Sequence, residues 1–450
     1  MIVSKFGGTS VADAPAILRL IDIVRTRVAE RPVVVVSALA GVTDMLLGLA
    51  RRAEAGNDAA LDDAVGALVE RHEQIAARLP GATAALEAIT ADAEALQREL
   101  GCIDRRRVTL AELDAIAGRG ELWSSRLIAA ALTGAGIEAV WLDIRPILVT
   151  DDRFTRATPY LQVVNTRVRE CLRPLAEQGI VTVTQGFIGA TATGVPTTLG
   201  RGGSDFTAAI LGAALGAMRV EIWTDVDGLM TADPRIVPSA RTLSAASYEE
   251  AAELATFGAR ILHPATALPL VRAGIPIVIL NSSHPERRGT TVEPEAQLDL
   301  VGDSPIRSIS WKQNITVVNI RAPRMLGTYG FLRALFELFE RHETVVDVLA
   351  SSEVSISLTI EDRSRLDPLV RDLSELGEVW IEEHRAIVAI VGIGLRNTPG
   401  VAARVFNAVW PANVEIISQG ASSINMTFVV REEDGPDVVR RLHMEFFGSC

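Results

Sequence analysis

Short runs of β-branched and aliphatic residues alternate with helical patterns over the first 300 residues of this chain. The runs that have the length and composition of buried strands are residues 2–5, 33–37, 140–143, 180–184, 220–224 and 275–280. Between them, apolar residues recur at helical spacing, most clearly over residues 14–29, 205–215 and 248–256. This alternation predicts an α/β domain in which helices cover a mainly parallel sheet, with ligands bound at the carboxyl ends of the strands.

A long stretch rich in Ala, Leu, Glu and Arg interrupts the alternation over residues 44–134. Pro80-Gly81 breaks this stretch, and its apolar residues recur at helical spacing. We therefore expect a helical insertion that packs on the sheet, rather than a disordered linker. With this insertion, the first domain is expected to span residues 1–298.

The pattern changes near residue 300, where shorter units repeat. Gly330 opens an expected helix after a strand at residues 315–320, and Gly400 opens another after a strand at residues 385–391. Each helix leads into one strand (345–349 and 414–418) and then a second (354–360 and 423–430). We expect two copies of a small β-α-β-β unit within residues 299–450, the first at about 313–383 and the second at about 384–450. Such a pair behind an α/β domain more often binds a regulator or forms a dimer than performs chemistry.

The composition argues against several classes of partner. The chain has 450 residues, is 48% hydrophobic and carries a net charge of -12. This charge argues against nucleic acid or an anionic membrane, but leaves an anionic substrate open. The three cysteines lie far apart without metal-ligand spacing, so no metal centre is expected from them and a reducing compartment suits them. No apolar run reaches the length of a membrane span, and a strand at the N-terminus leaves no room for a signal peptide. We expect a cytoplasmic protein.

Lysine is almost absent, since only Lys5 and Lys312 occur among 44 basic residues. Lys5 opens the segment Lys5-Phe6-Gly7-Gly8-Thr9-Ser10 at the end of the first expected strand. An ammonium is a compact charge that fits among several oxygens, whereas guanidinium is a wide planar fork. A lysine followed by two glycines therefore suggests a charge placed where the backbone closes on an anion. The alternative is a lysine without a function at a strand end.

Two more glycine-containing loops stand out, although the chain has no Walker A pattern and no Gly-x-Gly-x-x-Gly fingerprint after a strand. One is Ser37-Ala38-Leu39-Ala40-Gly41-Val42-Thr43. The other, Gly200-Arg201-Gly202-Gly203-Ser204-Asp205, runs into an expected helix that Ser204 or Asp205 is placed to cap. Its glycines would expose N–H groups at the positive end of that helix, and Arg201 adds a fork suited to carboxylate or phosphate. The alternative is an ordinary capped helix.

The segment 224–235 follows another expected strand and contains Asp225, Asp227 and Asp233. Aspartates at this place suit Mg²⁺, a ribose or a helix N-terminus, and an acidic turn is the alternative. Together, the four segments offer fixed cations, backbone donors and a loop for nucleotide and metal, which phosphoryl transfer requires.

The motifs together resemble the aspartate kinase (aspartokinase) family of the amino-acid kinase superfamily. The matching segments are Lys5-Phe6-Gly7-Gly8-Thr9-Ser10, Gly200-Arg201-Gly202-Gly203-Ser204-Asp205, Thr224-Asp225-Val226-Asp227-Gly228 and Phe257-Gly258-Ala259-Arg260-Ile261-Leu262-His263-Pro264. The repeated tail looks like the paired ACT domains of aspartokinases, so the resemblance covers the whole chain. It implies an amino-acid kinase fold followed by two α+β ACT-like (βαββαβ) domains. It also implies transfer of the γ-phosphoryl group of ATP, with Mg²⁺, to the side-chain carboxylate of L-aspartate, the first step toward lysine, threonine and methionine.

The resemblance also assigns roles to individual positions. The residues implied for catalysis are Lys5, Arg201 and Asp205, and those implied for aspartate are Thr43, Glu121, Arg201, Gly202, Gly203 and Ser204. The residues implied for the nucleotide are Lys5, Gly7, Gly8, Thr9, Thr224, Asp225, Met230, Arg235, Arg260 and Ile261. Family members often carry lysine in place of Arg260 and tyrosine in place of Met230, and Met230 can pack on a base but cannot donate a hydrogen bond. We expect His263 to be structural.

ACT pairs resemble amino-acid sensors that bind effectors between subunits, which implies a homodimer and leaves a tetramer open. By resemblance to lysine-inhibited aspartokinases, the effector site would be lined by Met325, Thr328, Phe331, Leu332, Val346, Asp347 and Ser352. Asp347 would pair with a ligand ammonium. Gly327-Thr328-Tyr329 and Val345 differ from the lysine-sensitive pattern, so lysine, threonine, a joint effector and insensitivity remain open. Plain packing between subunits is the alternative role for these residues.

Two other functions remain open on the sequence. Another amino-acid kinase would act on glutamate, acetylglutamate or carbamate, but such relatives generally lack an ACT pair. A catalytically inactive amino-acid sensor would keep the scaffold, but it would be free to lose Lys5, Arg201 and Asp205. Because the chain stops at Cys450, we expect a monofunctional kinase without a fused homoserine dehydrogenase.

Overall fold

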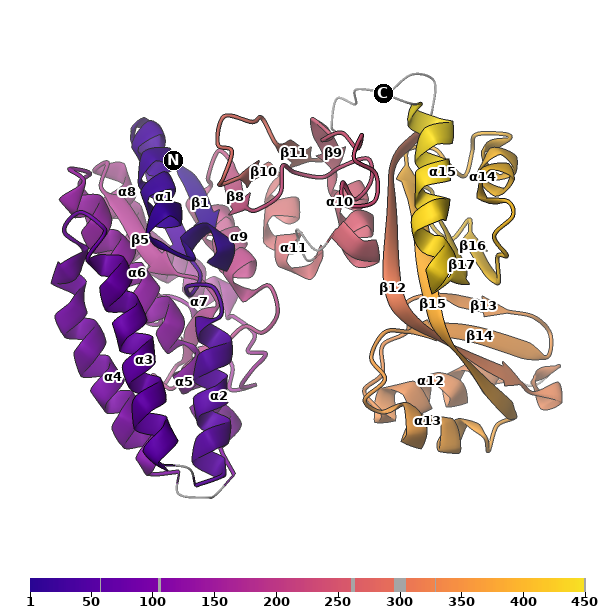
Figure 1. Cartoon of the computed structure of the whole chain (residues 1–450), viewed down its shortest axis with the longest axis horizontal. Coiled ribbons are helices and arrows are strands. Elements are labelled where there is room, and N and C mark those ends of the chain that lie inside the picture. Colours follow the sequence, from indigo (N-terminus) through magenta and orange to yellow (C-terminus); the bar gives the residue numbers. More distant parts are fainter. Residues whose placement is uncertain (57, 104–106, 260–263, 295–304, 328, 449–450) are drawn as a thin grey trace. The chain divides into compact units, whose positions relative to one another are not determined.

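The computed structural model describes residues 1–450 apart from 57, 104–106, 260–263, 295–304, 328 and 449–450. The described chain forms two compact units, and each contains a large sheet (Figure 1). The first unit contains residues 1–228, 244–248 and 261–297, and the second contains residues 229–243, 249–260 and 298–450. Two short segments of the second unit therefore precede residue 298 in the sequence.

The first unit is organised around a mostly parallel sheet, as the alternating pattern predicts. Its strand order is β3-β5-β2-β1-β8-β10-β11-β9, and the neighbours from β3 to β10 are all parallel. Each strand predicted for this domain is present, and no strand end differs from its predicted position by more than two residues. The bounds are β1 (Ile2–Phe6), β2 (Pro32–Val36), β3 (Ala139–Leu142), β5 (Val181–Gln185), β8 (Val220–Thr224), β9 (Ala245–Ser247), β10 (Ile277–Asn281) and β11 (Thr290–Glu293). A small second sheet contains β4 (Val149–Thr150), β6 (Ile188–Thr191) and β7 (Pro196–Thr198).

Helices pack on the sheet and on one another in this unit. The longer ones are α1 (Ala14–Arg27), α2 (Val42–Glu54), α3 (Asp58–Ala76), α4 (Leu86–Gly101), α5 (Leu110–Ala117), α6 (Arg119–Gly134), α9 (Gly203–Leu215) and α11 (Pro264–Ala273). Shorter ones are α7 (Leu161–Arg167), η4 (Val168–Leu172), α8 (Arg173–Glu177), η1 (Gly8–Val11), η2 (Val28–Glu30) and η3 (Ala82–Ala85). Within the stretch expected to be helical, α3 and α4 lie side by side (Figure 1). α6 packs against β3 and β5, and α9 packs against β1 and β8.

The second unit repeats one motif around a single antiparallel sheet. The strand order is β13-β14-β12-β15-β17-β16, so the two copies meet at the long strands β12 and β15. The strands are β12 (Ile306–Arg321), β13 (Leu349–Ser351), β14 (Ser355–Ile360), β15 (Glu378–Gly392), β16 (Ile416–Gln419) and β17 (Asn425–Arg431). The helices are α10 (Tyr248–Leu254), which begins in the first unit, η5 (Ala255–Ala259), η6 (Pro323–Met325), α12 (Phe331–Arg341), α13 (Leu366–Leu373), α14 (Val401–Val409), η7 (Glu432–Asp434) and α15 (Gly435–Phe447).

The repeat is visible at single residues. Gly330 and Gly400 are the N-caps of α12 and α14, and both have φ of 83°, a left-handed conformation that glycine adopts without strain. The expected strand at residues 345–349 begins later, because β13 starts only at Leu349. Val345 is 76% exposed there, so its β-branched side chain does not mark a half-buried strand.

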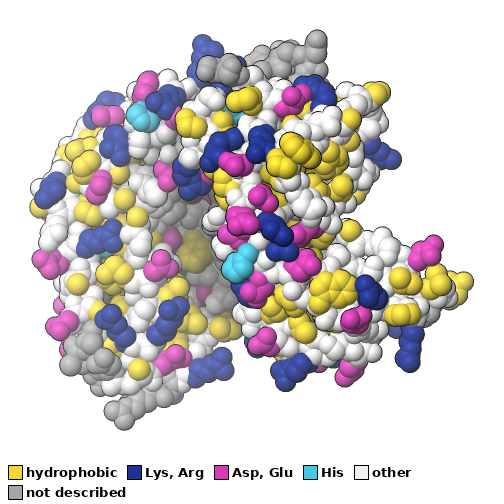
Figure 2. All heavy atoms as spheres, turned by 45° about the vertical axis from the view of Figure 1, so that its right-hand side comes forward, with side chains coloured by type: hydrophobic (Ala, Val, Ile, Leu, Met, Phe, Trp, Pro, Cys, Tyr) yellow, Lys and Arg dark blue, Asp and Glu magenta, His cyan; other side chains and the backbone are white. Residues whose placement is uncertain are grey.

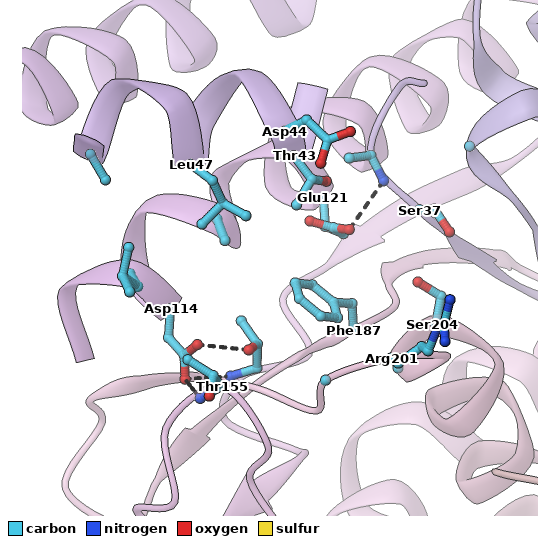
Figure 3. Close-up of a pocket in the computed structure, with 18 of the residues that line it drawn as sticks. Ser37, Thr43, Asp44, Leu47, Asp114, Glu121, Thr155, Phe187, Arg201 and Ser204 are labelled. Carbon is cyan, nitrogen blue, oxygen red and sulfur yellow. Dashed lines mark hydrogen bonds between the residues drawn. The ribbon is translucent and has the colours of Figure 1, made fainter. Parts of the chain in front are cut away.

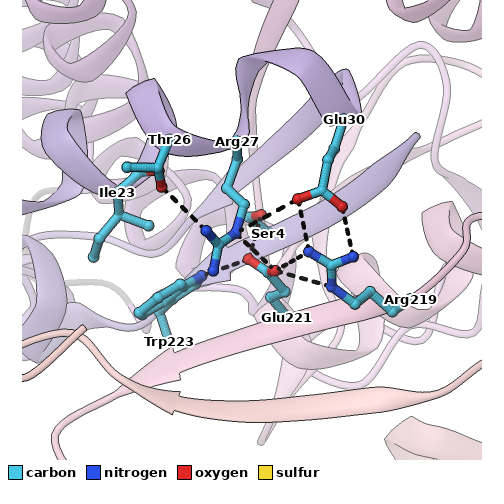
Figure 4. A network of polar contacts seen from close by, with 8 residues as sticks. All are labelled: Ser4, Ile23, Thr26, Arg27, Glu30, Arg219, Glu221 and Trp223. Carbon is cyan, nitrogen blue, oxygen red and sulfur yellow. Dashed lines mark hydrogen bonds and ion pairs between the residues drawn. The ribbon is translucent and has the colours of Figure 1, made fainter. Parts of the chain in front are cut away.

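A buried polar network holds β1 against β8 (Figure 4). Glu221 on β8 is 1% exposed, and its carboxylate accepts hydrogen bonds from the Ser4 hydroxyl (3.2 Å) and the Trp223 indole (3.1 Å). Its other oxygen accepts from Arg27 (3.1 Å) and Arg219 (2.7 Å). A buried carboxylate needs partners of this kind, because removing it from water is costly. The network therefore fixes how β1 lies beside β8, and with it the end of β1.

Basic and acidic side chains lie interspersed on the face of the molecule that Figure 2 shows. Many arginines pair with nearby carboxylates, as Arg25 does with Asp22. Among the described residues, no helix combines the length and apolar character needed to cross a bilayer.

Candidate active site

A pocket of about 940 Å³ lies within the first unit and contains every residue implied for catalysis or aspartate binding (Figure 3). It is lined from β1, from the loop after β2, and from α2, α5, α6 and the start of α9. The implied residues in its lining are Lys5, Gly8, Thr43, Glu121, Arg201, Gly202, Gly203, Ser204 and Asp205. Gly7 and Thr9 adjoin Gly8 on the chain. The pocket thus brings together segments that are more than a hundred residues apart in the sequence.

The Lys5 ammonium lies 2.6 Å from a carboxylate oxygen of Asp205. The two side chains are 11% and 15% exposed, so the pair is largely shielded from water but open to the pocket. Lys5 stands at the end of β1, and Asp205 stands in the first turn of α9. The carboxylate therefore fixes where the ammonium lies, and a cation fixed in this way can stabilise negative charge without reorganising.

The start of α9 differs from the sequence expectation. Neither Ser204 nor Asp205 caps this helix, because its N-cap is Gly202 and no side-chain cap bond forms. Asp205 pairs with Lys5 instead. Gly202 has φ of +73°, and a side chain on Gly203 would lie 2.7 Å from Phe187, so glycine suits both positions. The Gly203 N–H donates to the Gly200 carbonyl (3.0 Å), and no side chain caps the N–H groups that follow it in the first turn of α9. An uncapped helix N-terminus of this kind suits an anion.

Glu121 on α6 carries a carboxylate that is only partly satisfied. One oxygen accepts a hydrogen bond from the Ala38 N–H (3.3 Å), and the other oxygen is buried without a hydrogen-bond partner among the described residues. Burial raises the pKa of Glu121 to about 8, against the effect of the Ala38 hydrogen bond. In Figure 3 its carboxylate and the side chains of Arg201 and Ser204 lie on different sides of Phe187, and Thr43 lines the same pocket. An unpartnered buried acceptor in a pocket is a place for a cationic group.

Sequence reasoning missed Asp114 and Phe187, which also line the pocket. Asp114 is 2% exposed and accepts from the Thr155 N–H (2.8 Å), the Thr198 N–H (2.9 Å) and the Thr198 hydroxyl (2.7 Å). Burial raises its pKa, although these hydrogen bonds oppose the change. Asp114 therefore holds the loop at Thr155 and the end of β7 at the edge of the pocket. No motif marks it, because its partners lie 41 and 84 residues away.

The loop after β8 lies beside the glycine-rich turn after β1. The Gly7 N–H donates to the Trp223 carbonyl (3.2 Å), so the two chain segments touch where β1 and β8 end. Thr224 donates to Asp225 (3.2 Å), whose side chain is exposed. Asp227 is engaged elsewhere, because both of its carboxylate oxygens accept hydrogen bonds from Asn281 and Arg287.

The remaining residues implied for the nucleotide lie outside the first unit or outside the described residues. Met230 and Arg235 belong to the second unit. Arg235 pairs there with Asp233 (2.6 Å), which lowers the pKa of that carboxyl. Arg260, Ile261 and His263 lie outside the described residues.

The residues implied for an effector lie in the first repeat of the second unit. Met325, Phe331 and Val346 are partly buried and pack against one apolar cluster. Leu332 is 48% exposed, Ser352 is exposed, and Thr328 lies outside the described residues. The Asp347 carboxylate lies 3.0 Å from the Lys312 ammonium, and its second oxygen is buried without a hydrogen-bond partner among the described residues.

The sequence matches two protein-family models and several aspartokinases. The chain matches the model of the amino acid kinase family over residues 1–281 and that of the ACT domain over residues 388–446. It is 39% identical over 460 residues to the lysine-sensitive aspartokinase 3 of Escherichia coli (strain K12), with 99% of each chain covered. It is also 34% identical over 461 residues to the chloroplastic aspartokinase 3 of Arabidopsis thaliana, covering 99% of this chain and 81% of the relative.

Solved structures agree with the sequence matches. The E. coli aspartokinase III structure in complex with aspartate and ADP (R-state) superposes with a TM-score of 0.83 and 38% identity, covering 99% of this chain and 100% of that one. The structure of the same enzyme in complex with lysine and aspartate (T-state) gives a TM-score of 0.80 at 38% identity, with 99% of each chain covered. These matches confirm the predicted combination of an amino-acid kinase fold and ACT domains. The chain belongs to the aspartate kinase family.

Proposed function

We propose that this aspartate kinase carries out phosphoryl transfer in the pocket around Lys5 and Asp205. A side-chain carboxylate oxygen of L-aspartate attacks the γ-phosphorus of ATP and forms a new P–O bond. The bond between that phosphorus and the oxygen bridging to the β-phosphate breaks, and ADP leaves. Because a carboxylate is already nucleophilic, no strong base is needed, and positioning with charge stabilisation supplies the catalysis.

The Lys5–Asp205 pair is the observation that carries the catalytic assignment. Lys5 would stabilise the charge on the transferring phosphoryl group, while Asp205 keeps the ammonium in place at 2.6 Å. Gly7, Gly8 and Thr9 would cradle the phosphates. A side chain on Gly8 would lie 3.2 Å from the Ala38 carbonyl, so the backbone comes close to its neighbours at this point.

Aspartate would be held at both of its ends. The unpartnered oxygen of Glu121 would accept from the α-ammonium, and Thr43, which lines the same pocket, would also contact aspartate. Arg201 would bind a substrate carboxylate, and Gly202 and Ser204 would offer donors at the start of α9. Gly203 would line the same subsite, although its own N–H donates to the Gly200 carbonyl (3.0 Å). Glu121 and Arg201 lie in the lining of the same pocket, which supports one ligand that carries both charges.

ATP would lie along the loop after β8, where Thr224 and Asp225 follow the strand. Met230, Arg235, Arg260 and Ile261 complete the set of residues proposed for the nucleotide. The Thr224 hydroxyl and the Asp225 carboxylate offer oxygen ligands of the type that Mg²⁺ prefers, so this loop fits the ion. Mg²⁺ is usually held by one or two carboxylates together with substrate phosphates, and among the described residues no group of three or more potential ligands gathers. We therefore propose that Mg²⁺ arrives with ATP, where it would neutralise charge on the phosphates.

Hydroxylamine trapping tests the reaction. Purified protein with Mg-ATP should release ADP and form a hydroxamate with L-aspartate, because hydroxylamine captures an acyl phosphate. L-glutamate and N-acetylglutamate should give little product, as should a reaction without an acceptor. Equal product with N-acetylglutamate would instead favour another amino-acid kinase. Amino-acid binding without turnover on any acceptor would favour an inactive sensor.

We further propose that lysine inhibits the enzyme through its ACT repeats in a homodimer. The E. coli relative is named lysine-sensitive, and one of its structures contains lysine. In this chain, the unpartnered oxygen of Asp347 is suited to accept from a ligand ammonium. Met325, Phe331 and Val346, packed on the same apolar cluster, would contact the rest of the effector together with Thr328, Leu332 and Ser352. Lysine would act by favouring a less active arrangement of the dimer.

A further inference from the structure

The end of β10 touches both of the segments that we assign to the nucleotide. Asn281 is the last residue of β10 and pairs in parallel register with Thr224 at the end of β8. Asn281 and Ser282 are 6% and 5% exposed, so their polar side chains are buried in the first unit. Buried polar groups are costly unless they are hydrogen-bonded, so their partners indicate what they hold.

Asn281 holds the loop after β8 through Asp227. Its amide oxygen accepts from the Ser283 N–H (2.8 Å), which leaves its amide nitrogen to donate to Asp227 (2.7 Å). Arg287 donates to the other oxygen of Asp227. Because both carboxylate oxygens are engaged from the segment 281–287, this segment sets the position of Asp227, two residues beyond Asp225.

Ser282 connects the same strand end to the turn after β1. Its hydroxyl oxygen lies 2.8 Å from that of Ser10, so one hydroxyl donates to the other. The hydrogen that remains is donated to a carbonyl at the end of β8, either from Ser10 to Trp223 (3.1 Å) or from Ser282 to Thr224 (3.1 Å). In both arrangements, the two hydroxyls join the turn of residues 7–10 to the last carbonyls of β8. The Ser10 N–H also donates to the Gly7 carbonyl (2.9 Å) and closes that turn.

We propose that Asn281 and Ser282 are positioning residues for the nucleotide, which hold the turn of residues 7–10 and the loop of residues 224–228 at a fixed spacing. This inference rests on the nucleotide role that we propose for these two segments. The aspartate end of the pocket depends on other elements, since Thr43 lies on α2 and Glu121 on α6. Losing the positioning contacts therefore weakens nucleotide binding and leaves aspartate binding nearly intact.

Calorimetry with Mg-ADP tests this inference on the full chain. Ser282→Ala and Asn281→Ala should each raise the Kd for Mg-ADP by about five- to tenfold, the loss expected for a buried hydrogen bond. The KM for ATP should rise in parallel, whereas the KM for aspartate should change less than twofold. Ser282→Thr keeps the hydroxyl and should restore most of the affinity. Ser283→Ala is the matched control, because Ser283 is exposed and contributes its backbone N–H to Asn281.

Two further variants keep the test decisive if a buried substitution prevents folding. Arg287→Ala, on an arginine that is half exposed, should also weaken Mg-ADP binding, and Arg288→Ala on the exposed neighbouring arginine should not. The double variant Ser10→Ala, Ser282→Ala should raise the Kd for Mg-ADP little more than either single substitution does. Each substitution removes the same hydrogen bond between the two hydroxyls.

The inference and the proposed function fail in different ways. If Asp225→Asn weakens Mg-ADP binding but Ser282→Ala, Asn281→Ala and Arg287→Ala do not, the positioning role is wrong. Equal losses of aspartate and nucleotide binding in these variants would also overturn it, since they would indicate general loosening of the fold. If Asp225→Asn itself leaves Mg-ADP binding unchanged, the assignment of this loop to the nucleotide is wrong.

Discussion

The Lys5 ammonium and the Asp205 carboxylate lie 2.6 Å apart and join two glycine-rich segments of the chain. One segment ends β1, and the other begins α9. The pair lies in the same pocket as Glu121, whose buried oxygen has no hydrogen-bond partner among the described residues. A fixed cation and an unfilled acceptor in one pocket are what a kinase acting on an amino acid requires.

Aspartate binding should release a proton from Glu121. Burial raises the pKa of this carboxyl to about 8, so it is mostly protonated at pH 7 in the empty pocket. A bound α-ammonium favours the ionised form and lowers the pKa, so up to about one proton should leave per aspartate bound near pH 7. The release should disappear above pH 9, where Glu121 is already ionised. Calorimetry in buffers of different ionisation enthalpy measures it.

Glu121→Gln is the matched control for this coupling. The variant keeps the size of the side chain but has no proton to release, and its KM for aspartate should rise by about tenfold or more, since a charge-assisted hydrogen bond is lost. The same proton release in wild type and Glu121→Gln would show that another group carries the coupling.

Stability should fall in mild acid because of His72. Burial lowers the pKa of this residue to about 4, and its Nδ1 lies 2.7 Å from the Leu68 carbonyl. Between pH 6.5 and 4 the unfolded chain therefore binds more protons than the folded one, so stability rises with pH across this window. The free energy of unfolding should be lower by about 2 kcal/mol at pH 5 than at pH 7.5 from this residue alone.

Denaturant unfolding at the two pH values measures this effect. His72→Leu removes the titrating group while keeping an apolar side chain beside Trp123. The difference in stability between pH 5 and pH 7.5 should therefore shrink by about 2 kcal/mol in this variant. An unchanged difference would mean that other groups cause the acid sensitivity.

Glu221→Ala should destabilise the first unit strongly. The substitution removes the acceptor of the Ser4 hydroxyl and the Trp223 indole and the buried partner of Arg27. Arg219 keeps its two hydrogen bonds to Glu30, so the loss should be about 2–3 kcal/mol, that of buried donors left without an acceptor. Thermal unfolding measures the loss. Asp22→Ala, which breaks an exposed pair with Arg25, should change stability little. Similar effects of the two substitutions would contradict the structural importance of the network.

Lysine inhibition should depend on Asp347. Asp347→Asn keeps the shape of the side chain but removes its charge, so half-maximal inhibition should need at least about ten times more lysine. Asp362→Asn, on an exposed aspartate of the same unit, is the control, and lysine should inhibit this variant at the same concentration as the wild type. If millimolar lysine does not inhibit the wild type, the proposed effector is wrong, and threonine or a joint effector should be tested next.

The strands and most of the residues that line the pocket could be predicted, because neighbouring residues in the sequence mark them. β1, β2 and β5 are buried throughout, and Val33–Val36 of β2 and Val181–Thr184 of β5 are continuous β-branched runs, as expected for central parallel strands. Lys5 and Asp205 each lie inside a short motif of contiguous residues, so the sequence alone could mark them as residues of one site. Gly330 and Gly400 likewise mark the starts of equivalent helices, since left-handed N-caps favour glycine.

The positions that the sequence did not reveal depend on distant partners. Asp114 binds residues 41 and 84 positions away, and Glu221 binds Ser4 217 positions away, so no local pattern marks them. The expected cap at the start of α9 was wrong for the same reason, because Asp205 pairs instead with Lys5, 200 positions earlier in the sequence. Asn281 and Ser282 follow an ordinary strand, and their importance appears only when the neighbouring loops are in place.

Replacing each of the two lysines by arginine tests the central claim most directly. Hydroxamate formation from L-aspartate should fall by at least about 100-fold in Lys5→Arg, because a planar guanidinium does not fit the place of the ammonium beside Asp205. Lys312→Arg should keep the wild-type rate without lysine, and both variants should unfold at the wild-type temperature. A near-normal kcat in folded Lys5→Arg would contradict the catalytic role of the Lys5–Asp205 pair.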